Sequence, residues 1–166
     1  MSVTLHTTHG DLKLEIFCSA VPKTAYNFLA LCASGQYTGT PIHRLIPNFV
    51  VQTGGSPSSP NLQKPLSQSI YGNDFEDEIR PTLRHNARGI VSMANKGPAT
   101  NGSQFFVCFA PAPHLDGKNT VFGRVIEGGD TTLDVLEGLQ VDKKSRPVEK
   151  CVVERVTMHA NPLADE

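Results

Sequence analysis

Short stretches of alternating apolar and polar residues recur along the whole chain. VTLHT (residues 3–7) and LKLEIF (residues 12–17) alternate on either side of a Thr-His-Gly-Asp segment. Gly10 within that segment can adopt a positive φ, so the pattern predicts a β-hairpin. Further strands are predicted at residues 42–46, 48–52, 89–95, 104–109, 120–126 and 150–158. Eight strands of this kind predict a closed antiparallel β-barrel, in which no strand edge is left exposed.

Two segments have the periodicity of amphipathic helices. In residues 22–35, Pro22 suits the first turn and Gly35 offers a left-handed stop. In residues 130–139, Asp130 can cap the helix start. The apolar stripes consist of Ala25, Phe28, Leu29 and Cys32 in the first helix and of Leu133, Leu136 and Leu139 in the second. Two such helices would cover the open ends of the barrel, so the predicted fold is mainly β.

Length and charge narrow the class of protein. The chain has 166 residues, and we expect residues 1–166 to form a single domain with a real core. Its 15 Lys and Arg nearly balance 16 Asp and Glu, whereas nucleic-acid-binding proteins normally carry a basic patch. The start MSVTLHTTHG lacks the features of a secretory signal, and no apolar run approaches the ~20 residues that span a bilayer. We therefore expect a protein of the cytoplasm or nucleus that is not secreted and binds neither nucleic acid nor membrane.

Cysteine and histidine spacing gives no sign of a metal site. The four cysteines are widely separated and none belongs to a CxxC pair, which favours free buried thiols in a reducing compartment. They are Cys18, Cys32, Cys108 and Cys151. No two of the six histidines have the spacing of zinc ligands, so no metal or other cofactor is expected.

Long polar side chains interrupt strands that otherwise look buried. Gln104 shares one face of its strand with Phe106, Gln52 shares a face with Val50, and Arg44 lies on a neighbouring segment. Such groups must find partners or solvent. Two interpretations stay open at this level. The polar residues either close a buried hydrogen-bond network or belong to a functional site.

Motifs for covalent catalysis are not convincing in this sequence. The segment HRLIPNFVVQTGG (residues 43–55) holds no cysteine, serine or carboxylate nucleophile. Ser103, His114 and Asp116 could be imagined as a hydrolytic triad, but nothing like a nucleophile elbow surrounds the serine. Asn101-Gly102-Ser103 is better interpreted as an Asn-Gly turn than as a glycosylation acceptor. Phosphate-loop and dinucleotide fingerprints are absent.

Four separated segments resemble the cyclophilin family. They are HRLIPNFVVQTGG, YGNDFEDE (71–78), MANKGPATNGSQFF (93–106) and HLDGKNTVFGRVIEG (114–128). They occur in the family's order, and the other predicted elements fit it over essentially residues 1–160. The start MSVTLHT, the HLD segment and the ending VTMHANP are most similar to the cyclophilin-like 3 (cyclophilin J) subgroup. The resemblance implies an eight-stranded barrel capped by two helices and a peptidyl-prolyl cis–trans isomerase that rotates Xaa-Pro bonds.

The resemblance also implies roles for individual residues. Arg44 matches the family's catalytic arginine, Gln52 the amide that orients it, and Phe49 an apolar wall of the proline pocket. The substrate-binding residues implied are Val50, Ala94, Asn95, Gln104, Phe106, His114, Leu115 and Asn119. Phe106 and Leu115 would hold the proline ring, and Asn95 would grip the preceding peptide through its backbone.

Several positions depart from the family's pattern. His114 stands where cyclosporin-sensitive members have tryptophan, which predicts weak cyclosporin binding. Val50 and Asn119 replace a methionine and a histidine that are common in relatives. The glycine-rich loop becomes SPSSPNLQKPLSQ (residues 56–68), so the rim of the groove is expected to differ. Lys96 occupies a usually small position, and we expect it to extend into solvent.

Two functional hypotheses follow from the resemblance. The first is an active isomerase that acts on Xaa-Pro segments of proteins as a monomer. The second is a proline-peptide binding module of a nuclear splicing complex with little turnover. A barrel that encloses a small ligand is disfavoured, because the many Phe, Val, Ile and Leu residues indicate a filled interior.

Overall fold

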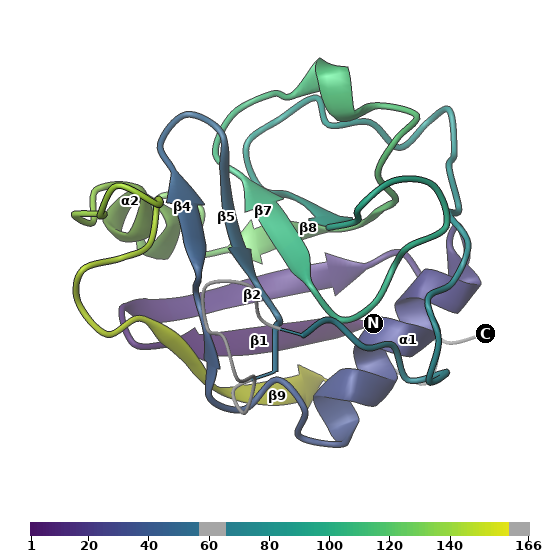
Figure 1. The fold of residues 1–166 in the computed structure, drawn as a ribbon, viewed down its shortest axis with the longest axis horizontal. Coiled ribbons are helices and arrows are strands. Elements are labelled where there is room, and N and C mark those ends of the chain that lie inside the picture. Colours follow the sequence, from purple (N-terminus) through teal and green to yellow (C-terminus); the bar gives the residue numbers. More distant parts are fainter. Residues whose placement is uncertain (57–65, 160–166) are drawn as a thin grey trace.

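A curled antiparallel sheet dominates the computed structural model, which describes residues 1–56 and 66–159 (Figure 1). Within these residues the sheet has nine strands in the order β3-β9-β1-β2-β8-β6-β7-β5-β4. The strands are β1 (Ser2–Thr7), β2 (Gly10–Ile16), β3 (Thr40–Pro41), β4 (Arg44–Ile46), β5 (Val50–Thr53), β6 (Ile90–Met93), β7 (Phe105–Cys108), β8 (Val121–Glu127) and β9 (Val152–His159). The predicted hairpin is confirmed, because β1 pairs with β2 and Gly10 has a φ of 129°.

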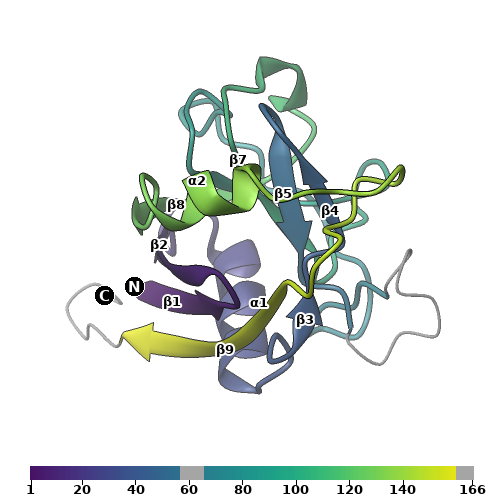
Figure 2. The same cartoon turned by 90° about the vertical axis from the view of Figure 1, so that its left-hand side faces the viewer.

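The prediction of a closed eight-stranded barrel needs one correction. The end strands β3 and β4 are separated only by Ile42 and His43, yet no ladder of described residues pairs them (Figure 2). The Ile42 N–H donates to the Cys151 carbonyl (2.9 Å), whereas the His43 N–H donates to the Gln52 carbonyl (3.2 Å). The predicted strand 42–46 therefore changes its pairing partner at this point. The barrel is open at this seam, and the two-residue β3 is the ninth strand.

The two predicted helices lie on opposite sides of the sheet (Figure 1). Helix α1 (Pro22–Ala33) has Pro22 in its first turn, and Gly35 follows its end with a φ of 79°. Helix α2 (Thr132–Glu137) is shorter than predicted, and Asp130 does not cap it. Thr131 holds the N-cap position without a side-chain hydrogen bond, and the Thr132 hydroxyl donates to the Asp11 carbonyl instead (2.7 Å). No helix in the described part of the chain is long and apolar enough to cross a membrane.

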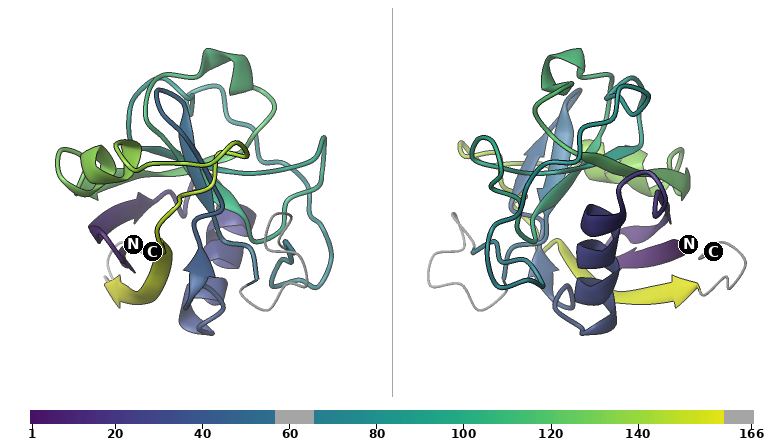
Figure 3. Two further views of the ribbon diagram at one scale, coloured as in Figure 1. Left: turned by 60° about the vertical axis from the view of Figure 1, so that its left-hand side comes forward. Right: turned by 90° about the vertical axis from the view of Figure 1, so that its right-hand side faces the viewer.

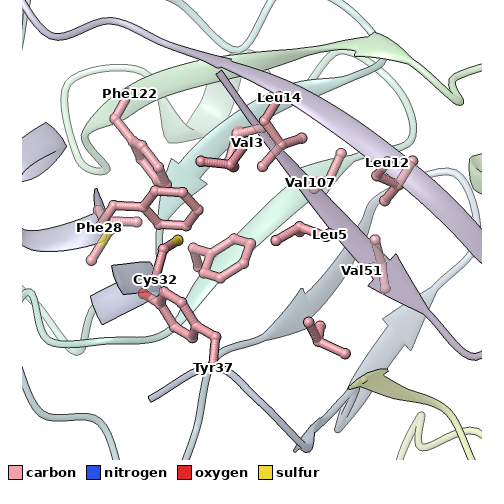
Figure 4. Close-up of a cluster of buried hydrophobic side chains, with 14 of the residues drawn as sticks. Val3, Leu5, Leu12, Leu14, Phe28, Cys32, Tyr37, Val51, Val107 and Phe122 are labelled. Atoms are coloured by element: carbon pink, nitrogen blue, oxygen red, sulfur yellow. The ribbon is translucent and has the colours of Figure 1, made fainter. Parts of the chain in front are cut away.

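Aromatic rings form the centre of the core. Phe28 of α1 contacts Tyr37, Phe105 and Phe122, with ring centroids 4.9 to 5.4 Å apart (Figure 4). Strand β9 pairs with β1, so its end lies beside the start of the chain, as the turned views show (Figure 3). Phe106 belongs to a second, smaller cluster on the opposite face of β7. The alternation predicted for residues 104–109 is thus confirmed, and this smaller cluster is where the candidate site lies.

Candidate active site

A row of side chains crosses the outer face of four adjacent strands. Arg44 of β4 is opposite Gln52 of β5, Gln52 is opposite Phe106 of β7, and Phe106 is opposite Ser92 of β6. Residues directly opposite each other in antiparallel strands point to the same face of the sheet. A pocket of about 300 Å³ opens at this row. It is lined by Arg44, Phe49, Val50, Gln52, Ala94, Asn95, Phe106, Leu115 and Asn119.

A chain of polar side chains borders the pocket on the Arg44 side. The Arg44 Nη1 group donates to Gln52 Oε1 at 3.3 Å, and Gln52 Nε2 donates to Gln104 Oε1 at 2.9 Å. Arginine can only donate, so the orientation of the Gln52 amide follows from its contact with Arg44. No described carboxylate forms an ion pair with Arg44. No described neighbour therefore neutralises the guanidinium, which can donate hydrogen bonds to a ligand.

Apolar side chains form a second part of the pocket lining. Val50 and Phe106 are almost fully buried, and Leu115, on the short helix η1 (Pro113–Leu115), packs against them. The Phe49 ring lies 5.9 Å from Arg44 Cζ and 5.4 Å from the imidazole of His114. A charged donor beside such a surface can meet a ligand with one polar atom on an apolar ring.

A buried histidine supports the Phe106 wall from behind. The His85 ring lies nearly parallel to the Phe106 ring, with centroids 6.0 Å apart, and its side chain is 1% exposed. Burial lowers the pKa of His85, although the neighbouring Asp116 opposes this shift. The ring Nδ1–H donates to Asp116 Oδ1 (2.9 Å), and Nε2 contacts the Ser92 hydroxyl (2.8 Å), which also donates to the Thr120 carbonyl (3.1 Å). His85 thereby connects strand β6 to the segment that carries Leu115.

Asparagine side chains hold the remaining rim of the pocket. Asn119 Nδ2 donates to the Met93 carbonyl (3.0 Å), and Asn95 Nδ2 donates to the Lys118 carbonyl (2.9 Å). The Ala94 N–H donates to the Gln104 carbonyl (3.1 Å). The two asparagine bonds join the end of β6 to the loop before β8, and the Ala94 bond joins it to the segment before β7, so the rims keep a fixed spacing.

The structure brings together all eleven residues that the family resemblance assigned to the site. Nine of them line the pocket, and the other two adjoin it: Gln104 contacts Gln52, and His114 contacts Phe49. Lys96 is exposed, as predicted. In the altered loop, the Ser56 N–H donates to the Leu66 carbonyl, and residues 57–65 lie outside the described part of the chain.

Two lesser expectations have clear outcomes. Asn101 does not form an Asn-Gly turn, because it is fully buried, forms a bridge with Phe75 and donates from Nδ2 to the Phe75 carbonyl (3.0 Å). The rejected triad is not assembled, because the Ser103 hydroxyl donates to the Gly54 carbonyl and Asp116 contacts His85. The supporting pair His85 and Asp116 was missed by the sequence analysis. Its members lie in loops that have no periodicity, so no local signal identifies them.

Burial decides the reactivity of two of the cysteines. The four cysteines are present as thiols, and burial raises the pKa of Cys108 and of Cys151 to about 12. Thiols with such a pKa are poor nucleophiles at neutral pH. No group of three or more His, Cys, Asp or Glu side chains in the described residues could hold a metal ion.

Comparison with known proteins identifies the family to which the chain belongs. The family described as "Cyclophilin type peptidyl-prolyl cis-trans isomerase/CLD" matches residues 2–158, and the chain belongs to this family. A cyclophilin-type isomerase of Cryptosporidium parvum, solved in the presence of the dipeptide Ala-Pro, has a TM-score of 0.89 and 42% identity. The match covers 97% of this chain and 100% of that one.

The curated relatives narrow the resemblance further. Peptidyl-prolyl cis-trans isomerase-like 3 of Neurospora crassa is 68% identical, and the human protein of the same name is 54% identical. Each match covers 99% of both chains. The chain is thus a peptidyl-prolyl cis–trans isomerase most similar to the isomerase-like 3 subgroup, which confirms the predicted family and activity.

Proposed function

We propose that the pocket beside Arg44 binds the proline of an Xaa-Pro segment and that Arg44 is the catalytic residue. Rotation about this bond breaks amide resonance across a barrier of ~18–20 kcal/mol, and the uncatalysed reaction takes tens to hundreds of seconds. No bond to another atom is made, so neither a nucleophile nor a proton carrier is required. The observation that carries the proposal is a guanidinium that forms no ion pair with a described carboxylate and lies beside the apolar side chains of a pocket of about 300 Å³.

Arg44 would act on the nitrogen of the rotating bond. As the amide twists, the prolyl nitrogen regains its lone pair and can accept a hydrogen bond from the guanidinium. This contact is stronger in the transition state than in the substrate, which is the condition for catalysis. A hundredfold acceleration requires about 2.7 kcal/mol, which one well-aimed charged donor can supply. The bond from Arg44 to Gln52 limits the directions in which the guanidinium can point.

The apolar walls would hold the proline ring, and the polar rim would hold the peptide before it. Phe49, Phe106 and Leu115 suit the ring because they form a contiguous apolar surface. Gln52 and the backbone of Asn95 lie on the side where the preceding carbonyl would enter. The related C. parvum enzyme was solved in the presence of the dipeptide Ala-Pro, which supports binding of an Xaa-Pro segment.

The likeness to the isomerase-like 3 subgroup supports a second proposal about partners and location. The substrates would be proline-containing segments of a nuclear or cytoplasmic complex, such as a splicing complex, and the protein would act on them as a monomer. Val50 gives a shorter wall than methionine would, which lowers contact with the proline ring. A binding module with slow turnover is therefore the alternative to an efficient enzyme.

One experiment separates these functions. Exchange NMR on an Ala-Pro peptide is expected to show acceleration by the wild type and a loss of about 100-fold for Arg44→Ala, with similar peptide affinity. Arg124→Ala is the matched control, because Arg124 pairs with Glu15 away from the pocket. Equal acceleration by the wild type and Arg44→Ala would remove Arg44 from catalysis. Binding by both proteins with acceleration by neither would leave only the binding module.

A further inference from the structure

The turn between β4 and β5 carries one wall of the pocket but makes few contacts of its own. Its two central residues, Pro47 and Asn48, are exposed, and Asn48 has a φ of 63°. Phe49 follows directly, and its N–H donates to the Ile46 carbonyl to close the turn (3.0 Å). An exposed turn of this kind would move unless another element held it. The position of the Phe49 ring depends on what that element is.

Helix α2, which lies beside β4 in Figure 1, supplies the contact through its last residue. The Asn48 N–H donates to Glu137 Oε2 at 2.8 Å. The other carboxylate oxygen, Glu137 Oε1, accepts from Arg88 Nη1 at 2.7 Å. Bonds that involve a charged partner are shorter and stronger than neutral ones. A single carboxylate thus joins the backbone of the turn to an arginine that is 49 positions away from Glu137.

Arg88 closes the network on the other side. Its Nη1 group also donates to the Phe109 carbonyl (3.0 Å), and its Nη2 group donates to Asp134 (2.5 Å). The guanidinium lies 5.5 Å from the centre of the Phe109 ring. The Phe109 N–H in turn donates to the Phe49 carbonyl (2.8 Å). The hydrogen bonds therefore form a closed ring from Asn48 through Glu137, Arg88 and Phe109 back to Phe49.

Local preference does not explain why a carboxylate stands at this position. Glu137 ends α2, and a negative charge is disfavoured at the C-terminus of a helix. The side chain is only 24% exposed. Partial burial opposes ionisation of this carboxyl, but the Asn48 N–H and Arg88 outweigh it and lower its pKa. Residues that break a local rule often serve a site, and here the site is the wall formed by Phe49.

We propose that Glu137 and Arg88 are positioning residues for the isomerase, which hold the Phe49 wall of the proline pocket through the backbone of Asn48. The assignment rests on the proposed function of that pocket. The ring of hydrogen bonds holds the Phe49 wall equally in the substrate complex and in the transition state. Loss of these hydrogen bonds therefore weakens substrate binding more than it slows the chemical step. The network fixes the wall without touching the ligand, and its effect appears in KM rather than in kcat.

The test compares steady-state kinetics of variants on an Ala-Pro peptide well below their melting temperatures. Glu137→Ala and Arg88→Ala are each expected to raise KM about fivefold to tenfold with little change in kcat. The KM of the double variant is expected to be no higher than that of the more impaired single variant, because the two residues act as a unit. Glu137→Gln is expected to be intermediate, since its amide oxygen can still accept from Asn48 while its amide N–H faces Arg88. Glu15→Ala, which breaks the ion pair with Arg124, is the control and should match the wild type.

A spectroscopic measurement separates positioning from mere stability. The Asn48 amide resonance of the wild type is expected to titrate with an apparent pKa below the ordinary 4.5 of glutamate, and Glu137→Gln should abolish this titration. A KM within twofold of the wild type in fully folded Glu137→Ala would overturn the proposal. Should Arg44→Ala keep full activity, the catalytic role of Arg44 would be rejected, whatever the KM of Glu137→Ala. An inactive Arg44→Ala together with a normal Glu137→Ala would reject only the positioning role.

Discussion

Replacing Gln52 with alanine tests whether Arg44 must be held in one direction. Gln52 accepts from Arg44 at 3.3 Å and donates to Gln104 at 2.9 Å, so the substitution removes the only described side-chain acceptor of the guanidinium. Hydrogen bonds to charged groups contribute about 1.5–3 kcal/mol. The 3.3 Å distance and the exposure of Arg44 place this bond at the low end, near 1–2 kcal/mol. We therefore expect kcat/KM to fall by about 5- to 30-fold.

The measurement is exchange NMR on an Ala-Pro peptide, with kcat and KM determined separately. The loss should appear mainly in kcat, because the arginine acts when the amide is twisted. Gln52 is half-buried, and its loss leaves Gln104 Oε1 with access to water. The melting temperature should therefore fall by only about 2–4 °C, the shift for about 1 kcal/mol in a domain of this size. Gln140→Ala, at an exposed position beyond α2, is the matched control.

A second substitution distinguishes orientation from charge. Gln52→Glu would hold Arg44 by an ion pair but would also neutralise its field. If the positive charge stabilises the transition state, Gln52→Glu should be less active than Gln52→Ala. Greater activity of Gln52→Glu would mean that orientation alone matters. Activity of Gln52→Ala within twofold of the wild type would refute the orienting role altogether.

Two further predictions concern single histidines. His114 is exposed and its ring contacts Phe49. Because indole offers a larger apolar surface, His114→Trp should bind cyclosporin about tenfold more tightly than the wild type. Isothermal titration calorimetry measures this affinity, and an unchanged value would contradict the prediction. Burial lowers the pKa of His85 below 6.5 in the folded state, so the unfolded state binds the proton more readily. The contribution of His85 to stability is therefore present above about pH 6.5 and lost as the pH falls below it. The melting temperature of His85→Gln should depend less on pH between 6.5 and 5 than that of the wild type, and equal slopes would show that His85 does not titrate there.

Local patterns in the sequence predicted most of the fold. Period-two alternation identified eight of the nine strands and placed Phe105 and Phe106 on opposite faces of β7. The stripe in residues 22–35 identified α1, because its buried residues recur at helical spacing. The gap in strand pairing between β3 and β4, beside Ile42, could not be predicted. Strand pairing there depends on how far the sheet curls, and no short window of sequence encodes that.

The sequence by itself placed Arg44, Gln52 and Phe106 on strand faces, because alternation is local, and its resemblance to the cyclophilins assigned these side chains to a candidate site. Tertiary structure alone decided what supports them. Asn48, Arg88 and Glu137 are far apart in the chain and meet only after the sheet has brought α2 beside the β4–β5 turn. His85 and Asp116 come together in the same way behind Phe106. Hydrogen bonds of this kind depend on the relative positions of packed elements, which hydrophobic periodicity does not specify.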